Sequence, residues 1–96
     1  MRVAITARAT ADLEDIFAYI SVENPLAAIN YVRALRARAK GLGNFPRKFA
    51  IRSDLPGDLR GVPHGSHVIL YRIAKARVEV VRFVHGARDL PSVFEK

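Results

Sequence analysis

The sequence predicts an α+β fold in which an N-terminal strand is followed by an antiparallel helix hairpin. The hairpin is expected to pack on a small antiparallel sheet of about four strands. Three observations support this fold: apolar residues between 10 and 42 recur at helical spacing, residues 67–73 and 77–84 are rich in β-branched residues, and the chain has 96 residues. That length suits one modest hydrophobic core, so we expect residues 1–96 to form a single domain.

The first two expected elements are a short strand and a helix. Residues 2–6, RVAIT, alternate apolar and polar side chains as a half-buried strand does. Thr10 is the expected N-cap of the helix, because acidic residues follow it in the early turns. Four apolar residues then fall at i, i+3, i+4 and i+7: Leu13, Ile16, Phe17 and Ile20.

A second helix is expected after a short link. Asn24 is its predicted N-cap and Pro25 its first residue, while Gly41 and Gly43 are expected to end it. Because the link is short, the two helices should form an antiparallel hairpin. The apolar stripe of this helix is narrow: Ala28, Val32, Leu35, Ala39 and Leu42. Three cations lie on another face and are expected to be solvated: Arg33, Arg36 and Lys40.

The rest of the chain is predicted to be a loop followed by a β-hairpin. Residues 44–66 hold three prolines and three glycines, which indicates a loop with at most a short strand near residues 59–62. The runs 67–73 and 77–84 are apolar on both faces, as in central strands. Two helices can cover only one face of this sheet. We therefore expect an exposed apolar patch on the other face, covered in part by the C-terminal residues Leu90, Val93 and Phe94.

Charge is unevenly distributed along the chain. The protein has 16 Lys and Arg against 9 Asp and Glu, a formal net charge of +7. Residues 1–32 hold 2 basic and 4 acidic side chains (2 − 4 = −2), so the remainder holds 14 and 5 (14 − 5 = +9). This distribution favours a polyanion or an acidic protein segment as partner, although a generally basic soluble surface is the alternative.

Four arginines and one histidine are the candidate functional residues. Guanidinium groups match the geometry of phosphate oxygens. Each arginine has an alternative role, in which it pairs with a carboxylate or packs its aliphatic stem on the sheet. Asp89 is the candidate partner of Arg88, and Glu79 or Asp58 is the candidate partner of Arg82. The histidine can act as an acid or base near neutral pH, or simply hold a strand end. The five residues are Arg60, Arg72, Arg82, Arg88 and His85.

Other classes of site and location are not supported. The chain has no cysteine, and His64, His67 and His85 do not have a helical metal-ligand spacing, so neither a metal site nor a cofactor is expected. No set of nucleophile, base and orienting residue is evident. The N-terminus lacks the apolar core of a signal peptide, and no run has membrane-spanning length, so we expect a cytoplasmic location without membrane contact.

Four segments together resemble the RelE/ParE superfamily of toxins from type II toxin–antitoxin systems. They are ATADLEDIFAYISVENPLAA (9–28), LRGVP (59–63), VILYRI (68–73) and VVRFVHGARDL (80–90). The resemblance covers nearly the whole chain, and the HGARD ending is similar to the ParE branch. It implies a helix hairpin over an antiparallel sheet, and a cognate ParD-like antitoxin that binds the toxin in a hetero-oligomeric complex.

The resemblance to the ParE branch implies a toxin that poisons DNA gyrase by binding it, without an active site of its own. The RelE branch implies the alternative, a ribosome-dependent mRNA endonuclease, and a degenerate toxin kept as a binding partner is a third possibility. We expect the target, and any direct contact with nucleic acid, at Arg60, Arg72, Arg82, His85 and Arg88. On the nuclease alternative, the catalytic residues are Arg60, Arg72, Arg82 and His85. The expected antitoxin-binding residues are Tyr71, Val81, Phe83 and Phe94.

Overall fold

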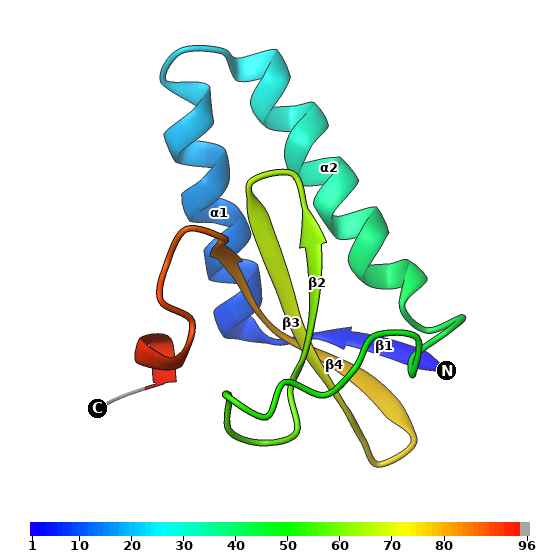
Figure 1. The fold of residues 1–96 in the computed structure, drawn as a ribbon. Coiled ribbons are helices and arrows are strands. Elements are labelled where there is room, and N and C mark those ends of the chain that lie inside the picture. Colours follow the sequence, from blue (N-terminus) through cyan, green and yellow to red (C-terminus); the bar gives the residue numbers. More distant parts are fainter. Residues whose placement is uncertain (95–96) are drawn as a thin grey trace.

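The computed structural model describes residues 1–94, and it confirms the predicted α+β fold class. Figure 1 shows two helices that form an antiparallel hairpin beside a sheet of strands. The elements, in chain order, are β1 (Arg2–Ile5), α1 (Ala7–Ser21), α2 (Pro25–Gly41), β2 (Arg60–His64), β3 (His67–Ala74), β4 (Arg77–His85) and the 3-10 helix η1 (Pro91–Phe94).

The strand order of the sheet is β1-β4-β3-β2. Strands β3 and β4 are therefore central, as their two-sided apolar pattern predicts. The β2–β3 and β3–β4 pairs are antiparallel, but β1 runs parallel to β4, so the sheet is mixed and not wholly antiparallel. The alternation of a four-residue strand shows which side chains share a face and says nothing about strand direction. The apolar pattern of β1 therefore could not predict that this strand pairs with β4 in parallel.

The helix boundaries agree with the sequence at the second helix and differ at the first. The Asn24 side chain accepts a hydrogen bond from the Ala27 N–H at 3.0 Å, and Pro25 is the first residue of α2, as predicted. The N-cap of α1, however, is Thr6 and not Thr10. Its Oγ1 accepts from the Ala9 N–H at 3.1 Å, so the helix begins about one turn earlier than predicted.

A β-bulge changes the register in the middle of the β3–β4 pair. Arg72 lies opposite Glu79, whereas Leu70 lies opposite Arg82. The two registers differ by one residue, and Val81 is the extra residue on β4. A bulge of this kind bends the strand and redirects the side chains that follow it. The redirected residue here is Arg82, whose position is described below.

Both faces of the sheet are covered by the chain itself. The helix side holds the larger core: Ala9, Leu13, Leu35, Ala39, Leu42, Val62, Ile69, Tyr71, Val78, Val80 and Phe83. On the other side, a smaller core joins residues of the long loop and the C-terminal segment to the sheet: Leu55, Leu59, Leu70, Val84 and Leu90. The expected open apolar patch is therefore largely absent, because two leucines of the proline-rich loop fold back over it.

Two general features of the described residues limit the kinds of site to consider. Within residues 1–94, no helix is long and apolar enough to cross a membrane. The same residues contain no group of three or more His, Cys, Asp and Glu side chains placed to hold a metal ion. The candidate groups in this part of the chain are therefore the arginines, the histidines and the exposed apolar side chains.

Candidate functional site

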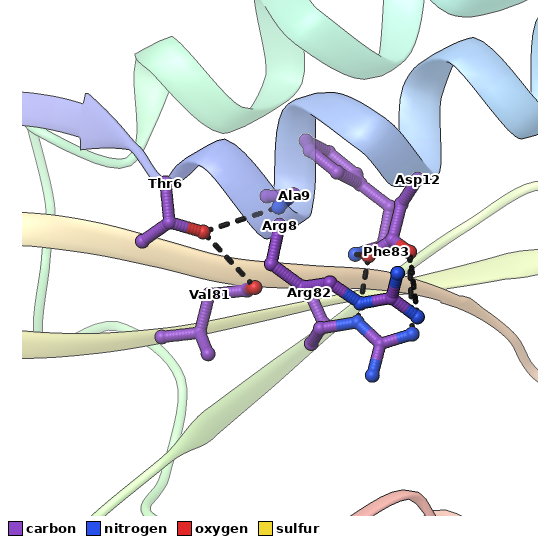
Figure 2. Close-up of polar contacts among 7 residues, drawn as sticks. All are labelled: Thr6, Arg8, Ala9, Asp12, Val81, Arg82 and Phe83. Carbon is purple, nitrogen blue, oxygen red and sulfur yellow. Dashed lines mark hydrogen bonds and ion pairs between the residues drawn. The ribbon is translucent and has the colours of Figure 1, made fainter.

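The end of β4 lies beyond its neighbour β1 and is held instead by side chains of the α1 region. Thr6 Oγ1 donates to the Val81 carbonyl at 3.2 Å. Asp12 Oδ2 accepts from the Phe83 N–H at 3.0 Å. These two contacts replace the hydrogen bonds that a further strand residue would make, and Figure 2 shows both of them. The open edge of β4 is thus satisfied without another strand.

Arg82 pairs with Asp12 at this edge (Figure 2). Its Nε and Nη2 donate to the two carboxylate oxygens at 2.8 and 3.2 Å. The two residues are only 9% and 5% exposed. The partner is neither Glu79 nor Asp58, the two acids that the sequence suggested. A buried, two-point ion pair between elements 70 residues apart is primarily structural, which does not fit the expectation that Arg82 faces a target.

A groove of about 450 Å³ lies between α1 and the end of β4. It brings together Arg82, His85 and Arg88, three of the residues expected at the target surface. Arg8 and Ile20 of α1 line the opposite wall. His85 Nδ1 accepts from the Ala87 N–H at 3.1 Å, so the histidine also closes the turn after β4. Because its cations and apolar side chains are close together, the groove suits a partner with both acidic and apolar groups.

A tyrosine and a second histidine at this groove were not among the sequence candidates. The Tyr31 hydroxyl lies 2.6 Å from His67 Nδ1 and accepts from the Ser66 N–H at 3.3 Å, which fixes α2 to the β2–β3 turn. Burial lowers the pKa of His67, and the nearby His85 and His64 lower it further. His67 is therefore neutral at neutral pH. Tyr31 is next to the apolar stripe of its helix, and no local pattern in the sequence pointed to this contact.

Arg60 and Arg72 are not part of this groove. Arg60 Nη1 donates to the Phe49 carbonyl at 2.6 Å and holds the long loop against β2. Arg72 Nε donates to Glu79 at 3.0 Å, and Arg77 donates to the other oxygen of the same carboxylate at 2.8 Å. Hydrogen bonds from Arg77 and Arg72 lower the pKa of Glu79. The four residues of the nuclease alternative are thus not gathered, since only Arg82 and His85 share the groove.

The apolar residues expected to bind an antitoxin are mostly covered. Tyr71 and Phe83 are 0% and 2% exposed and belong to the core under the helices, so neither side chain is open to a partner in this structure. Val81 and Phe94 are partly buried against the smaller core. The alternation along a strand was correct, but the face that carries Tyr71 and Phe83 is the one the helices cover.

Large exposed apolar side chains lie instead near the tip of the helix hairpin. Tyr19 and Val22 are each 83% exposed, and Leu26, the second residue of α2, is 67% exposed. Tyr19 and Val22 border the same surface hollow of about 350 Å³. All three residues stand outside the apolar stripes that the helical spacing selects. Apolar residues outside both stripes are the sequence signal that indicates an interaction surface here.

Comparison with known proteins places the chain in a family. A family model described as ParE toxin of type II toxin–antitoxin system, parDE, matches residues 3–90. Toxin ParE1 of Caulobacter vibrioides is 34% identical over 89 residues, covering 88% of this chain and 88% of that protein. Toxin RelE2 of the same organism is 36% identical over 87 residues, covering 91% and 97%.

A solved structure has the same fold. The protein superimposes on a chain from a structure titled as the chromosomal ParDE TA system from P. aeruginosa, with a TM-score of 0.75 and 24% sequence identity. The match covers 88% of this chain and 95% of the other. The family match spans residues 3–90 and therefore includes the helix hairpin, the sheet and the groove. The chain belongs to the ParE family of toxins from type II toxin–antitoxin systems.

Proposed function

We propose that this toxin acts by binding DNA gyrase and poisoning it, and that a ParD-like antitoxin neutralises it in a hetero-oligomeric complex. The observation that carries this proposal is that the candidate arginines of the strands are hydrogen-bonded to other groups of the toxin. Arg82 is held by Asp12, Arg72 by Glu79 and Arg60 by the Phe49 carbonyl. A ribonuclease needs converging groups that can move a proton, whereas a poison that acts by binding needs only a surface.

The groove supplies the surface that we assign to the target. Arg88 is exposed and forms no ion pair with a carboxylate of residues 1–94. His85 is exposed as well, and its Nε2 remains available after Nδ1 has bound the Ala87 N–H. Arg8, whose side chain is 61% exposed, stands on the α1 side. Direct contact with the DNA held by gyrase is part of the proposal.

The hairpin tip supplies the surface that we assign to the antitoxin. Tyr19, Val22 and Leu26 are apolar and more than half exposed, which is unusual so close together on a small domain. Val81 and Phe94 are partly buried and border the far face of the sheet, where an antitoxin that wraps around the toxin would also reach them. Substituting Leu26 should therefore weaken neutralisation without weakening toxicity.

A ribosome-dependent mRNA endonuclease remains the second candidate function. The observation that favours it is the 36% identity to a protein named Toxin RelE2. His67 and His85, whose ring centroids are 5.4 Å apart, are the only pair of imidazoles in contact within the described chain that could transfer protons at the groove. The isolated position of Arg60 and Arg72 counts against this candidate.

One experiment with two readouts separates the candidates. Purified toxin is added to supercoiled plasmid with gyrase and ATP, and separately to a translation extract. We expect linear and nicked plasmid to accumulate while translation continues. Arg88→Ala should reduce plasmid cleavage at least tenfold, and Lys75→Gln, which removes a charge at the opposite end of β4, should not. Ribosome-dependent cuts at defined codons with intact plasmid would establish the nuclease function instead.

A further inference from the structure

A continuous part of the chain carries positive charge without any compensating acid. Residues 24–53 contain no Asp and no Glu, and they cover the whole of α2 and the first part of the long loop. The acid-free segment carries seven cations: Arg33, Arg36, Arg38, Lys40, Arg47, Lys48 and Arg52. Such a run is longer than helix chemistry requires, since only the last turn of a helix gains from cations.

The structure leaves most of these cations exposed. Arg52 pairs with Asp54 at 2.6 Å and is set aside. The other six are exposed and have no carboxylate of residues 1–94 within ion-pair distance. We call them the α2 basic surface: Arg33, Arg36, Arg38, Lys40, Arg47 and Lys48. The sequence predicted that three of these residues are solvated, but it did not predict that the loop adds to them.

Five of the six cations form two sets, and Arg47 lies in the loop beside the second set in sequence. At roughly 100° per residue, Arg33, Arg36 and Lys40 fall within about 60° of one another, and they span about 10 Å of helix axis. The second set is held by the loop: the Arg38 guanidinium and the Lys48 ammonium lie 5.9 and 5.6 Å from the centre of the Phe49 ring. The ring holds both cations beside the helix through cation–π attraction.

Small side chains occupy the strip of helix surface between the two sets. Ala34, Ala37 and Gly41 are all exposed, and a Cβ built on Gly41 would meet nothing within 4 Å. A helix with small side chains between two sets of cations can approach a rigid polyanion closely. One strand of a DNA duplex carries a phosphate every 3.4 Å or so along the axis, so a 10 Å set of cations spans about three phosphates.

We propose that the α2 basic surface binds the phosphate backbone of duplex DNA. Nucleic acid fits better than an acidic protein, because six cations without a paired carboxylate in residues 1–94 surround the strip, whereas the centre of a protein interface is depleted of charged residues. The exposed apolar side chain beside Ala37 and Gly41 is Phe45, and its aromatic ring lies among the cations. Four of the six cations are arginines, whose planar fork matches phosphate oxygens. This inference rests on and extends the proposed gyrase function, because gyrase holds duplex DNA. The binding of DNA by the α2 basic surface can nevertheless be measured with the free toxin, in the absence of gyrase.

The test measures binding of the free, full-length toxin to a fluorescent duplex of mixed sequence by anisotropy. Each phosphate neutralised contributes about −0.9 to the slope of log K against log salt, measured between about 50 and 200 mM salt. The variant is Arg33→Gln with Lys40→Gln. The matched control is Arg2→Gln with Lys75→Gln, which makes the same change in net charge at two exposed positions outside the α2 basic surface.

The α2 variant should lower the magnitude of the slope by about two and weaken binding at least tenfold, whereas the control should change the slope little. Equal losses in both variants would show a response to net charge and overturn the proposal, as would the absence of DNA binding. Loss of antitoxin binding in place of DNA binding would assign the surface to an acidic protein. A toxin that binds DNA through α2 yet leaves gyrase unaffected would refute the proposed function and not this inference.

Discussion

Arginines in β4 and in α2 differ in their exposure to solvent and in their pairing with carboxylates. Arg82 is 9% exposed, and its Nε and Nη2 both bind Asp12. Arg33 and Arg36 are exposed, and no carboxylate of residues 1–94 pairs with them. A buried guanidinium must be paired because desolvation is costly, whereas an exposed one is solvated by water and stays available to a partner. The position of the acids in the fold therefore decides which cations can serve an interaction.

The largest effect is expected at the buried pair. Arg82→Ala leaves the Asp12 carboxylate buried without its counter-charge, which costs about 3–5 kcal/mol. The total stability of a domain of this size is on the order of 5–15 kcal/mol, so the variant should be close to unfolding at 37 °C. Urea unfolding followed by circular dichroism measures the loss.

The matched control for this prediction is Arg8→Ala. Arg8 lies 3.9 Å from the same carboxylate but its side chain is 61% exposed, so removing it should cost less than about 1 kcal/mol. A double variant of Asp12 and Arg82 to alanine should be less destabilised than the sum of the two single variants. If Arg82→Ala is as stable as Arg8→Ala, the pair does not anchor β4 and the contrast with α2 is lost.

Most local features of the fold were predictable from the sequence, with the N-cap of α1 as an exception, and the long-range pairings were not. Asn24 and Pro25 mark the start of α2, and the two-sided apolar runs mark the central strands, because each signal lies within a few residues of the structure it sets. The Asp12–Arg82 pair joins positions 70 residues apart. It depends on a bulge at Leu70 that no spacing in the sequence reveals.

The candidate site was predicted in part. His85 and Arg88 do line one groove with Arg82, because all three follow each other at one strand end. Tyr71 was expected on an open face, yet it is buried. The period of two in a strand says which residues share a face, but the packing of distant elements decides which face is covered. Leu55, in a loop rich in proline and glycine, contributes to that packing.

An intermediate effect is expected at Glu79, which shows what a partly exposed ion pair on the sheet contributes. Its pKa is lowered by hydrogen bonds from Arg77 and Arg72. A carboxylate whose pKa is lowered in the folded state stabilises the fold at pH values above its unfolded-state pKa of about 4.3. That stabilisation disappears as the pH falls through the folded-state pKa. Glu79→Gln should therefore lower the Tm modestly at neutral pH.

The difference in Tm between the protein and Glu79→Gln should shrink as the pH falls below about 4. Thermal unfolding between neutral and acid pH measures it, with Asp89→Asn as a control at an exposed carboxylate that forms no ion pair within residues 1–94. A Tm difference that grows on acidification would mean that Glu79 acts through packing and not through its charge.

The smallest effect on stability is expected at α2, in the variant Arg33→Gln with Lys40→Gln. Removing Arg33 relieves its repulsion with Arg36 three residues away, while removing Lys40 forfeits a cation in the last turn of the helix. These contributions are opposite in sign and each about 0.3–0.5 kcal/mol, so the free energy of unfolding should change by less than about 0.5 kcal/mol. The same variant is expected to weaken DNA binding at least tenfold. A loss of stability above about 1 kcal/mol would show that these cations hold the fold together as Arg82 does, because solvated side chains cannot contribute that much.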